Sequence, residues 1–214
     1  MTGPLPTPLT IGVLALQGDY AAHAKALRAS GADAVLVRQA AALNGLDGLV
    51  IPGGESTTLL TLLERAGMFE ALRSFAAASP VFGTCAGCIL LAKNVLGSNQ
   101  PNLAALDITV ERNAYGRQID SRVVQSDCTL PGGPLEMVFI RAPRIVGTGD
   151  TVEILATYQS YPTLVRQKTV LAATFHPELS ADHRVHRLFC SMVRDAAAEA
   201  MHRTGRGEIK TLTY

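Results

Sequence analysis

The sequence predicts a three-layer α/β fold with a mostly parallel central sheet and added antiparallel strands. Short apolar segments alternate with helix-patterned segments in the first half of the chain, which is typical of βαβ units and a parallel sheet. After Gly97, strand-like segments follow one another with turn residues between them, which indicates the antiparallel additions. The chain has 214 residues, 48% of them hydrophobic, enough for one domain with a sizeable core.

The first half predicts four strands, each followed by a turn or a helix. Apolar runs that end at glycine, proline or polar residues place these strands at residues 10–16, 33–38, 49–51 and 80–83. Apolar residues at helical spacing predict helices over 20–30, over 57–79 with a break near Gly67, and over 86–95.

The second half predicts more strands and a closing helix. The strand-like segments are 106–113, 121–127, 135–143, 152–159, 162–167 and 170–177, and the helix covers 180–203. No linker or repeat divides the chain, so we expect one domain over 1–214. Residues 1–9 form a flexible lead-in, and residues from about 203 to 214 form a loosely held tail.

Charge and hydropathy exclude several classes of function. The formal net charge is +1 and like charges do not cluster, so no nucleic-acid or membrane partner is expected. No apolar run approaches the ~20 residues of a membrane span, and the first ten residues do not resemble a secretory signal. We therefore expect a cytoplasmic protein with reduced thiols at its four cysteines, Cys85, Cys88, Cys128 and Cys190.

The segment Gly83-Thr84-Cys85-Ala86-Gly87 has the spacing of a nucleophile elbow, between an apolar strand and a helix. A sharp turn there would expose Cys85 in a strained backbone conformation, and the helix start would favour the thiolate. The N–H of Ala86 would point to a developing oxyanion. The pentapeptide alone fits equally well a buried cysteine in a glycine-rich turn.

A histidine and a carboxylate end a later apolar strand, in the segment "ATFHPELS". Residues i and i+2 of an extended chain lie on one side, so Glu178 is expected to orient His176 as the base for Cys85. Open α/β sheets place their sites at the carboxyl ends of strands. This position favours a functional pair over a chance histidine.

The segment "IPGGEST" follows the third strand. Gly53 and Gly54 offer backbone N–H groups that could complete an oxyanion hole. An ordinary strand-to-helix turn, with Ser56 or Thr57 as the N-cap, fits the same residues, and both interpretations hold together.

Three more segments extend these motifs into a resemblance to a known family: "LALQGDYAAHAKAL", "VERNAYGRQ" and "FIRAP". From about Ile11 to Val193 the chain resembles class I, triad-type glutamine amidotransferases, and among them the glutaminase subunits of pyridoxal 5′-phosphate synthases. The resemblance implies a flavodoxin-like fold, no cofactor, and hydrolysis of L-glutamine to glutamate and ammonia. It also implies a partner, a barrel-shaped synthase subunit in a large hetero-oligomer, which uses the ammonia to build pyridoxal phosphate.

The resemblance also implies roles for individual residues. Cys85 matches the nucleophile, His176 the general base and Glu178 the orienting carboxylate. The glutamine-binding positions are matched by Gly54, Glu55, Ser56, Arg112, Ile140 and Arg141, and Gly53 and Ala86 join the predicted substrate-binding residues through their oxyanion-hole N–H groups. An arginine suits the α-carboxylate of glutamine, although a structural ion pair would explain Arg112 and Arg141 equally well. Another elbow hydrolase, such as a γ-glutamyl hydrolase or peptidase relative, and a non-catalytic binding subunit remain the alternatives.

Two further features depart from this pattern. Cys88 forms a C-x-x-C match with Cys85, but the elbow glycines fit a redox pair poorly, and we expect Cys88 to be a small buried hydrophobe. His183 and His186 are three residues apart on the closing helix, and we expect them on a solvated or partner-facing surface. No metal site is expected. As a hypothesis, the peptide between Gly53 and Gly54 flips when the synthase subunit docks and so switches hydrolysis on.

Overall fold

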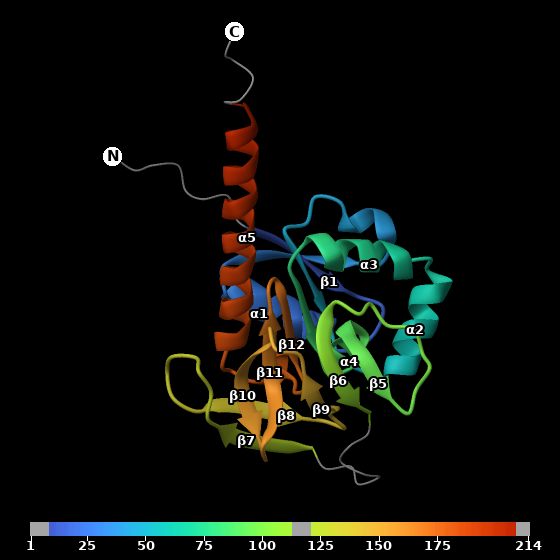
Figure 1. Ribbon diagram of the computed structural model, residues 1–214, viewed down its shortest axis with the longest axis vertical. Coiled ribbons are helices and arrows are strands. Elements are labelled where there is room, and N and C mark those ends of the chain that lie inside the picture. Colours follow the sequence, from blue (N-terminus) through green and yellow to red (C-terminus); the bar gives the residue numbers. More distant parts are fainter. Residues whose placement is uncertain (1–8, 113–120, 209–214) are drawn as a thin grey trace.

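The computed structural model describes residues 9–112 and 121–208, and a seven-stranded sheet lies at its centre (Figure 1). The strand order is β10-β11-β12-β4-β3-β1-β2. The strands from β12 to β2 pair in parallel, and β11 and β10 are added antiparallel at one edge. The bounds are β1 Leu9–Leu14, β2 Ala32–Val37, β3 Gly48–Ile51, β4 Val81–Thr84, β10 Glu153–Tyr158, β11 Tyr161–Gln167 and β12 Val170–Ala173. The predicted fold class is confirmed.

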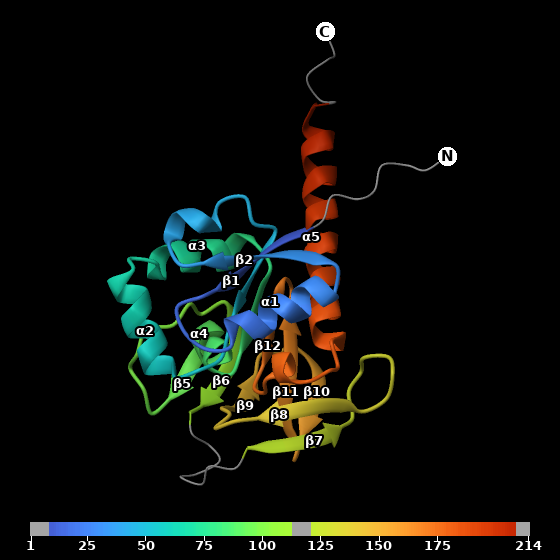
Figure 2. The same cartoon turned by 180° about the vertical axis from the view of Figure 1, so that it is seen from behind.

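Helices cover both faces of this sheet, as the two opposite views show (Figures 1 and 2). One face carries α1 (Tyr20–Ala29) and α5 (Arg184–Glu208), which contact each other. The other face carries α2 (Ser56–Arg65), α3 (Phe69–Ala78) and α4 (Ala86–Leu91). Two short 3-10 helices, η1 (Ala40–Leu43) and η2 (Pro177–Leu179), complete the helical elements of the described residues.

The hydrophobic core consists of two clusters, one on each face of the sheet. Leu27 of α1 and Phe189 of α5 belong to one cluster, and Leu59 of α2 belongs to the other. Val81 and Phe82, neighbours on β4, belong to different clusters because successive side chains of a strand point to opposite faces. Burial on both faces explains why the inner strands read as continuous apolar runs.

Two small sheets flank the central one. Strands β5 (Ala92–Leu96), β6 (Leu106–Glu111) and β9 (Arg144–Thr148) form the first, and β7 (Arg122–Ser126) and β8 (Leu135–Phe139) form the second. The helix predicted over 86–95 is wrong beyond Leu91, because the backbone is extended from Ala92 and pairs with β6. Strand β9 was not predicted.

The closing helix begins at Arg184 rather than at residue 180, and it reaches Glu208, beyond its predicted end at 203. Its C-terminal part extends past the rest of the described chain (Figure 1). Most of the predicted lead-in (1–8) and the end of the predicted tail (209–214) lie outside the described residues. The same is true of most of the "VERNAYGRQ" motif (113–118). Within the described residues, no helix is long and apolar enough to cross a membrane.

Candidate active site

Cys85 lies in the sharp turn between β4 and α4. Its backbone has φ 48° and ψ −104°, a region that non-glycine residues rarely adopt. The turn is tight because Gly83 and Gly87 lack side chains. A Cβ on Gly83 would lie 2.6 Å from the carbonyl carbon of Gly87, and one on Gly87 would lie 2.1 Å from the carbonyl oxygen of Ile51. The predicted strained turn is confirmed, but the prediction that it exposes Cys85 is wrong, since this residue is only 5% exposed.

His176 reaches Cys85 from the neighbouring strand. Strands β12 and β4 are parallel neighbours, with Ala173 opposite Thr84, so the chain segments that follow them leave the sheet side by side. The backbone N–H of His176 donates to the carbonyl of Val138 (2.8 Å), which fixes the segment after β12. The Cys85 and His176 side chains are neighbours, because both lie against Gly53.

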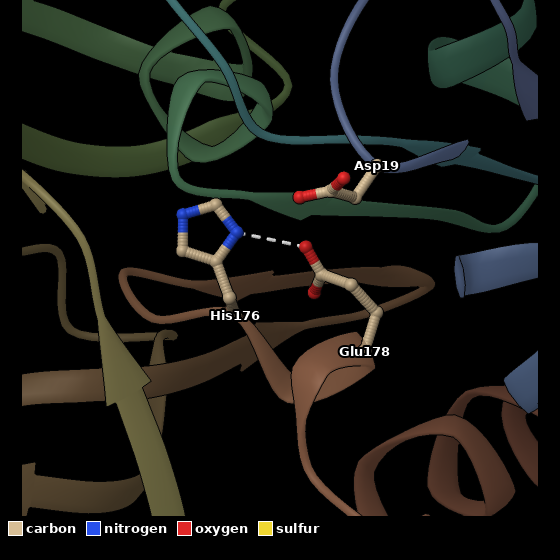
Figure 3. Close-up of side chains that lie close together, drawn as sticks. All are labelled: Asp19, His176 and Glu178. Carbon is tan, nitrogen blue, oxygen red and sulfur yellow. Dashed lines mark hydrogen bonds and ion pairs between the residues drawn. The ribbon is translucent and has the colours of Figure 1, made fainter. Parts of the chain in front are cut away.

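Glu178 holds the other side of the imidazole. The Nδ1–H of His176 donates to Oε1 of Glu178 at 2.7 Å, and both side chains are buried (Figure 3). The expected contact is present, but the extended backbone that predicted it is not. Glu178 lies in η2, and His176 precedes this 3-10 turn, which starts at Pro177.

Burial and charge shift the pKa values of this pair in opposite directions. Burial alone would raise the pKa of Glu178, but the electrostatic influence of His23 and the hydrogen bond and charge of His176 hold it well below its usual range. Burial alone would lower the pKa of His176, but hydrogen bonds and charge from Cys85 and Glu178 raise it to about 10. At neutral pH His176 is therefore an imidazolium, a charged group that can donate a proton during the reaction.

Three polar residues near this pair were missed in the sequence. Asp19, just before α1, places its carboxylate beside His176 and Glu178 (Figure 3). His23, one turn further on, and His186 of α5 are fully buried behind Glu178. The prediction that His186 lies on a surface is therefore wrong. The sequence contains one local indication of these residues, which is the position of His23 on the apolar face of α1. This position does not show which residues His23 contacts.

Asp19, His176 and Glu178 each offer one ligand atom, and these atoms lie within 4.8 Å of one another. Two carboxylates and an imidazole are suitable ligands for a divalent metal. The Nδ1 of His176 is already bonded to Glu178, however, so a metal would compete with that bond.

A cavity of about 60 Å³ opens next to Cys85 and brings together five of the predicted glutamine-binding residues. These residues are Gly54, Glu55, Ser56, Arg112 and Arg141.

The other three predicted residues lie around this cavity. Ala86 is buried directly after Cys85, and Ile140 is half-buried directly before Arg141. Gly53 is wedged between the two reactive side chains. A Cβ on Gly53 would lie 2.4 Å from Cε1 of His176 and 3.1 Å from Cβ of Cys85.

Glu55 and Arg112 have structural partners as well as places in the cavity wall. The N-cap of α2 is Glu55, whose carboxylate accepts the N–H groups of Thr57 (3.0 Å) and Thr58 (2.7 Å). The prediction of Ser56 or Thr57 as the cap is wrong, because the longer carboxylate reaches both donors. Arg112 donates to Gln100 (2.6 Å) and Thr57 (3.1 Å) and lies 3.4 Å from Glu55, so the ion-pair interpretation also holds.

Cys88 is fully buried in α4, as predicted. Burial, reinforced by the charge of Cys85, raises the pKa of the Cys88 thiol far above its usual range. A thiol that stays protonated is a poor redox partner, which disfavours the C-x-x-C interpretation. All four cysteines lie among the described residues, and all are free.

Comparison with known proteins places the chain among glutamine amidotransferases. The SNO glutamine amidotransferase family matches residues 13–195. A Koribacter versatilis protein named pyridoxal 5′-phosphate synthase subunit PdxT is 59% identical over 187 residues, which is 87% of this chain and 97% of that protein. Its namesake from Geobacillus thermodenitrificans is 51% identical over 189 residues, covering 88% and 97%. A crystal structure of a glutamine amidotransferase matches with a TM-score of 0.79 and 45% identity, over 86% of this chain and 98% of that one.

Proposed function

The chain belongs to the SNO glutamine amidotransferase family, and on this premise we propose that Cys85, His176 and Glu178 are the triad with which it hydrolyses glutamine. Its curated relatives, matched over 97% of their own length, are named as subunits of pyridoxal 5′-phosphate synthase. The chain is accordingly the glutaminase subunit of such a synthase, with glutamine as substrate and a synthase subunit as partner. Another type of elbow hydrolase is not favoured, because family and relatives agree.

The convergence of the Cys85 thiol, the His176 ring and the Glu178 carboxylate at the ends of β4 and β12 carries the proposal. The Cys85 thiolate attacks the side-chain amide carbon of glutamine. As the tetrahedral intermediate collapses, His176 gives its proton to the amide nitrogen, the C–N bond breaks and ammonia leaves. Water then loses a proton to His176 as it attacks the thioester carbon, and glutamate is released while the thiolate is restored.

The N–H groups of Ala86 and of the Gly53-Gly54 segment are proposed to stabilise the oxyanion of both intermediates. Gly54, Glu55 and Ser56, together with Arg112, Ile140 and Arg141, are proposed to bind glutamine. The two arginines supply positive charge for its α-carboxylate. The 60 Å³ cavity is far below the ~300 Å³ at which ligand pockets usually begin, so glutamine binding requires side chains or the Gly54 loop to move.

The proposal for the partner is more specific. The synthase subunit is barrel-shaped, the two subunits form a large hetero-oligomer, and ammonia passes directly between them in the cytoplasm. Direct transfer avoids the conversion of free ammonia to ammonium, which is not nucleophilic. No cofactor is needed for the hydrolytic half of this reaction.

The test is glutamate release from glutamine by the chain mixed with its synthase subunit. We expect Cys85→Ala to abolish release and to keep folding and complex formation, whereas the matched variant Cys88→Ala keeps activity. A glutamine-mimicking electrophile should label Cys85 and not Cys88. Labelling of Cys88 alone, or full activity of Cys85→Ala, would overturn the proposal.

A further inference from the structure

The second carboxylate oxygen of Glu178 has a partner that the triad does not include. While Oε1 accepts from His176, Oε2 lies 3.2 Å from Nε2 of His23, and the His23 and Glu178 side chains are both inaccessible to solvent. Oε2 has no hydrogen bond of standard geometry among the described residues, so this ion-pair contact is its compensation. We propose that His23 is a positioning residue of the triad, which holds Oε2 so that Oε1 stays on His176.

His23 is itself fixed from several sides. It lies on the buried face of α1, and its ring meets that of Phe82 edge-on, with centroids 6.1 Å apart. Its Nε2 also lies 3.1 Å from Oγ1 of Thr84, the residue before Cys85. One imidazole therefore contacts both the strand that carries the nucleophile and the carboxylate that holds the base.

The other ring nitrogen of His23 lies 3.1 Å from Nε2 of His186. Burial and the nearby charge of His23 lower the pKa of His186 to about 3, although Glu178 opposes this shift, so His186 is neutral at pH 7. If the proton of His186 is on Nε2, His186 donates it to Nδ1 of His23. If that proton is on Nδ1 of His186, the N–H group is buried without a partner, which is costly.

The Nε2 nitrogen of His23 has two polar neighbours. It makes a hydrogen bond with Oγ1 of Thr84, and its 3.2 Å contact with Oε2 of Glu178 is an ion-pair contact without hydrogen-bond geometry. When His186 donates to Nδ1 of His23, a neutral His23 carries its own proton on Nε2. When His186 accepts instead, His23 donates from Nδ1, and only its imidazolium form also has a proton on Nε2. A carboxylate oxygen only accepts, so the contact with Glu178 is favourable only with a proton on Nε2.

Loss of this donor would leave a buried carboxylate oxygen uncompensated. Glu178 would then rotate away or take up a proton, and His176 would lose its anchor. The glutamine cavity is lined by other residues, so glutamine binding should not change. His23 thus acts on the rate of the chemical steps and not on the affinity for substrate.

Two amide variants of His23 test whether an N–H group is needed at the position of Nε2. In His23→Gln the side-chain NH₂ reaches the Nε2 position and restores an N–H group beside Glu178 and Thr84. In His23→Asn the amide reaches only the Nδ1 position, so contact with His186 is kept and both Nε2 contacts are lost. In the complex with the synthase subunit, we expect His23→Asn to lower kcat about 10-fold or more relative to His23→Gln, at the size of one buried polar contact with a charged group. KM for glutamine should stay within about 2-fold in both variants.

His183→Gln serves as the control, since His183 is the neighbouring histidine and touches neither His23 nor Glu178 in any contact described above. If His23→Asn does not fold, His23→Phe removes the same donor and keeps the ring shape. Equal kcat values in the Gln and donor-lacking variants, or a change confined to KM, would overturn the inference. The inference rests on the proposed function, so wild type and Cys85→Ala are assayed alongside. An inactive wild type or an active Cys85→Ala would instead refute the function.

Discussion

Replacing Glu178 by glutamine keeps the shape of the triad and removes its negative charge. Burial lowers the pKa of His176, but hydrogen bonds and charge from Cys85 and Glu178 raise it from 6.5 to about 10. Glu178→Gln removes one of these contributions, a buried hydrogen bond between charged groups, which is worth about 2–3 kcal/mol.

The expected result is therefore a fall in kcat of about 30- to 150-fold for Glu178→Gln. The assay is steady-state glutamate release by the complex with the synthase subunit, measured over a range of glutamine concentrations to separate kcat from KM. The basic limb of the pH–rate profile, near pH 10 in the wild type, should move to lower pH, because the imidazolium loses its anionic partner. Glu136→Gln is the matched control, since its carboxylate accepts from Ser180 and does not contact His176.

An unchanged kcat in Glu178→Gln would refute the orienting role of the carboxylate. A loss as complete as that of Cys85→Ala would show that more than one buried hydrogen bond depends on Glu178 and would refute this magnitude.

Three more predictions follow from the same geometry. His176→Asn should cost nearly as much kcat as loss of the thiol, because the groups act as a unit, and near-normal glutamate release would contradict the triad. Glutamate release should rise about 10²- to 10³-fold when the synthase subunit is added. Gly18→Ala should change this ratio, because its Cβ would lie 2.1 Å from the Gly53 carbonyl oxygen. Equal rates with and without the synthase subunit would refute the peptide switch. The folded-state pKa of His186 is depressed from 6.5 to about 3, so its contribution to stability is present above pH 6.5 and is lost as the pH falls toward 3. Chemical denaturation at pH 6.5 and 5 measures the free energy of unfolding. Between these pH values it should fall more in wild type than in His186→Leu, by about 1.4 kcal/mol per pH unit. The titratable groups that face the His186 ring, His23, His183 and Glu178, are present in both proteins, and an equal fall in both would contradict the prediction.

A substitution at Gly53 does not isolate the peptide switch. A bulky residue there would displace His176 directly, at 2.4 Å from its ring, and would lower activity whether or not a switch exists. A Cβ on Gly18 would instead meet the Gly53 carbonyl and Pro52, and the φ of +74° at Gly18 adds backbone strain to the substitution.

The sequence predicts the central sheet well because its strands are buried on both faces and read as uninterrupted apolar runs. It fails at β5 and β9, where pairing between distant segments decides the structure. Ala92–Leu96 follows a helix without a break and becomes a strand because β6 pairs with it. Arg144–Thr148 contains a glycine and one exposed valine, too weak a pattern for a strand without its partner β6.

The triad residues could be predicted because each belongs to a local motif with a chemical meaning. His23 and His186 could not, since they are 163 residues apart and each looks unremarkable in its own helix. The role of Glu55 as a helix cap could not be predicted from the sequence either. Short side chains are the usual helix caps, and nothing local indicated that a longer carboxylate would serve two donors and an arginine together.

The backbone N–H of Cys85 donates to the carbonyl oxygen of Ala173 at 2.9 Å, in continuation of the ladder between β4 and β12. We expect this amide to exchange with deuterium only when two inner strands of the central sheet separate, an event that amounts to global opening. Exchange at this one position therefore reports on the integrity of the whole reactive turn. Local fluctuations of surface loops leave the turn intact, so thermal inactivation of the thiol should coincide with melting of the sheet.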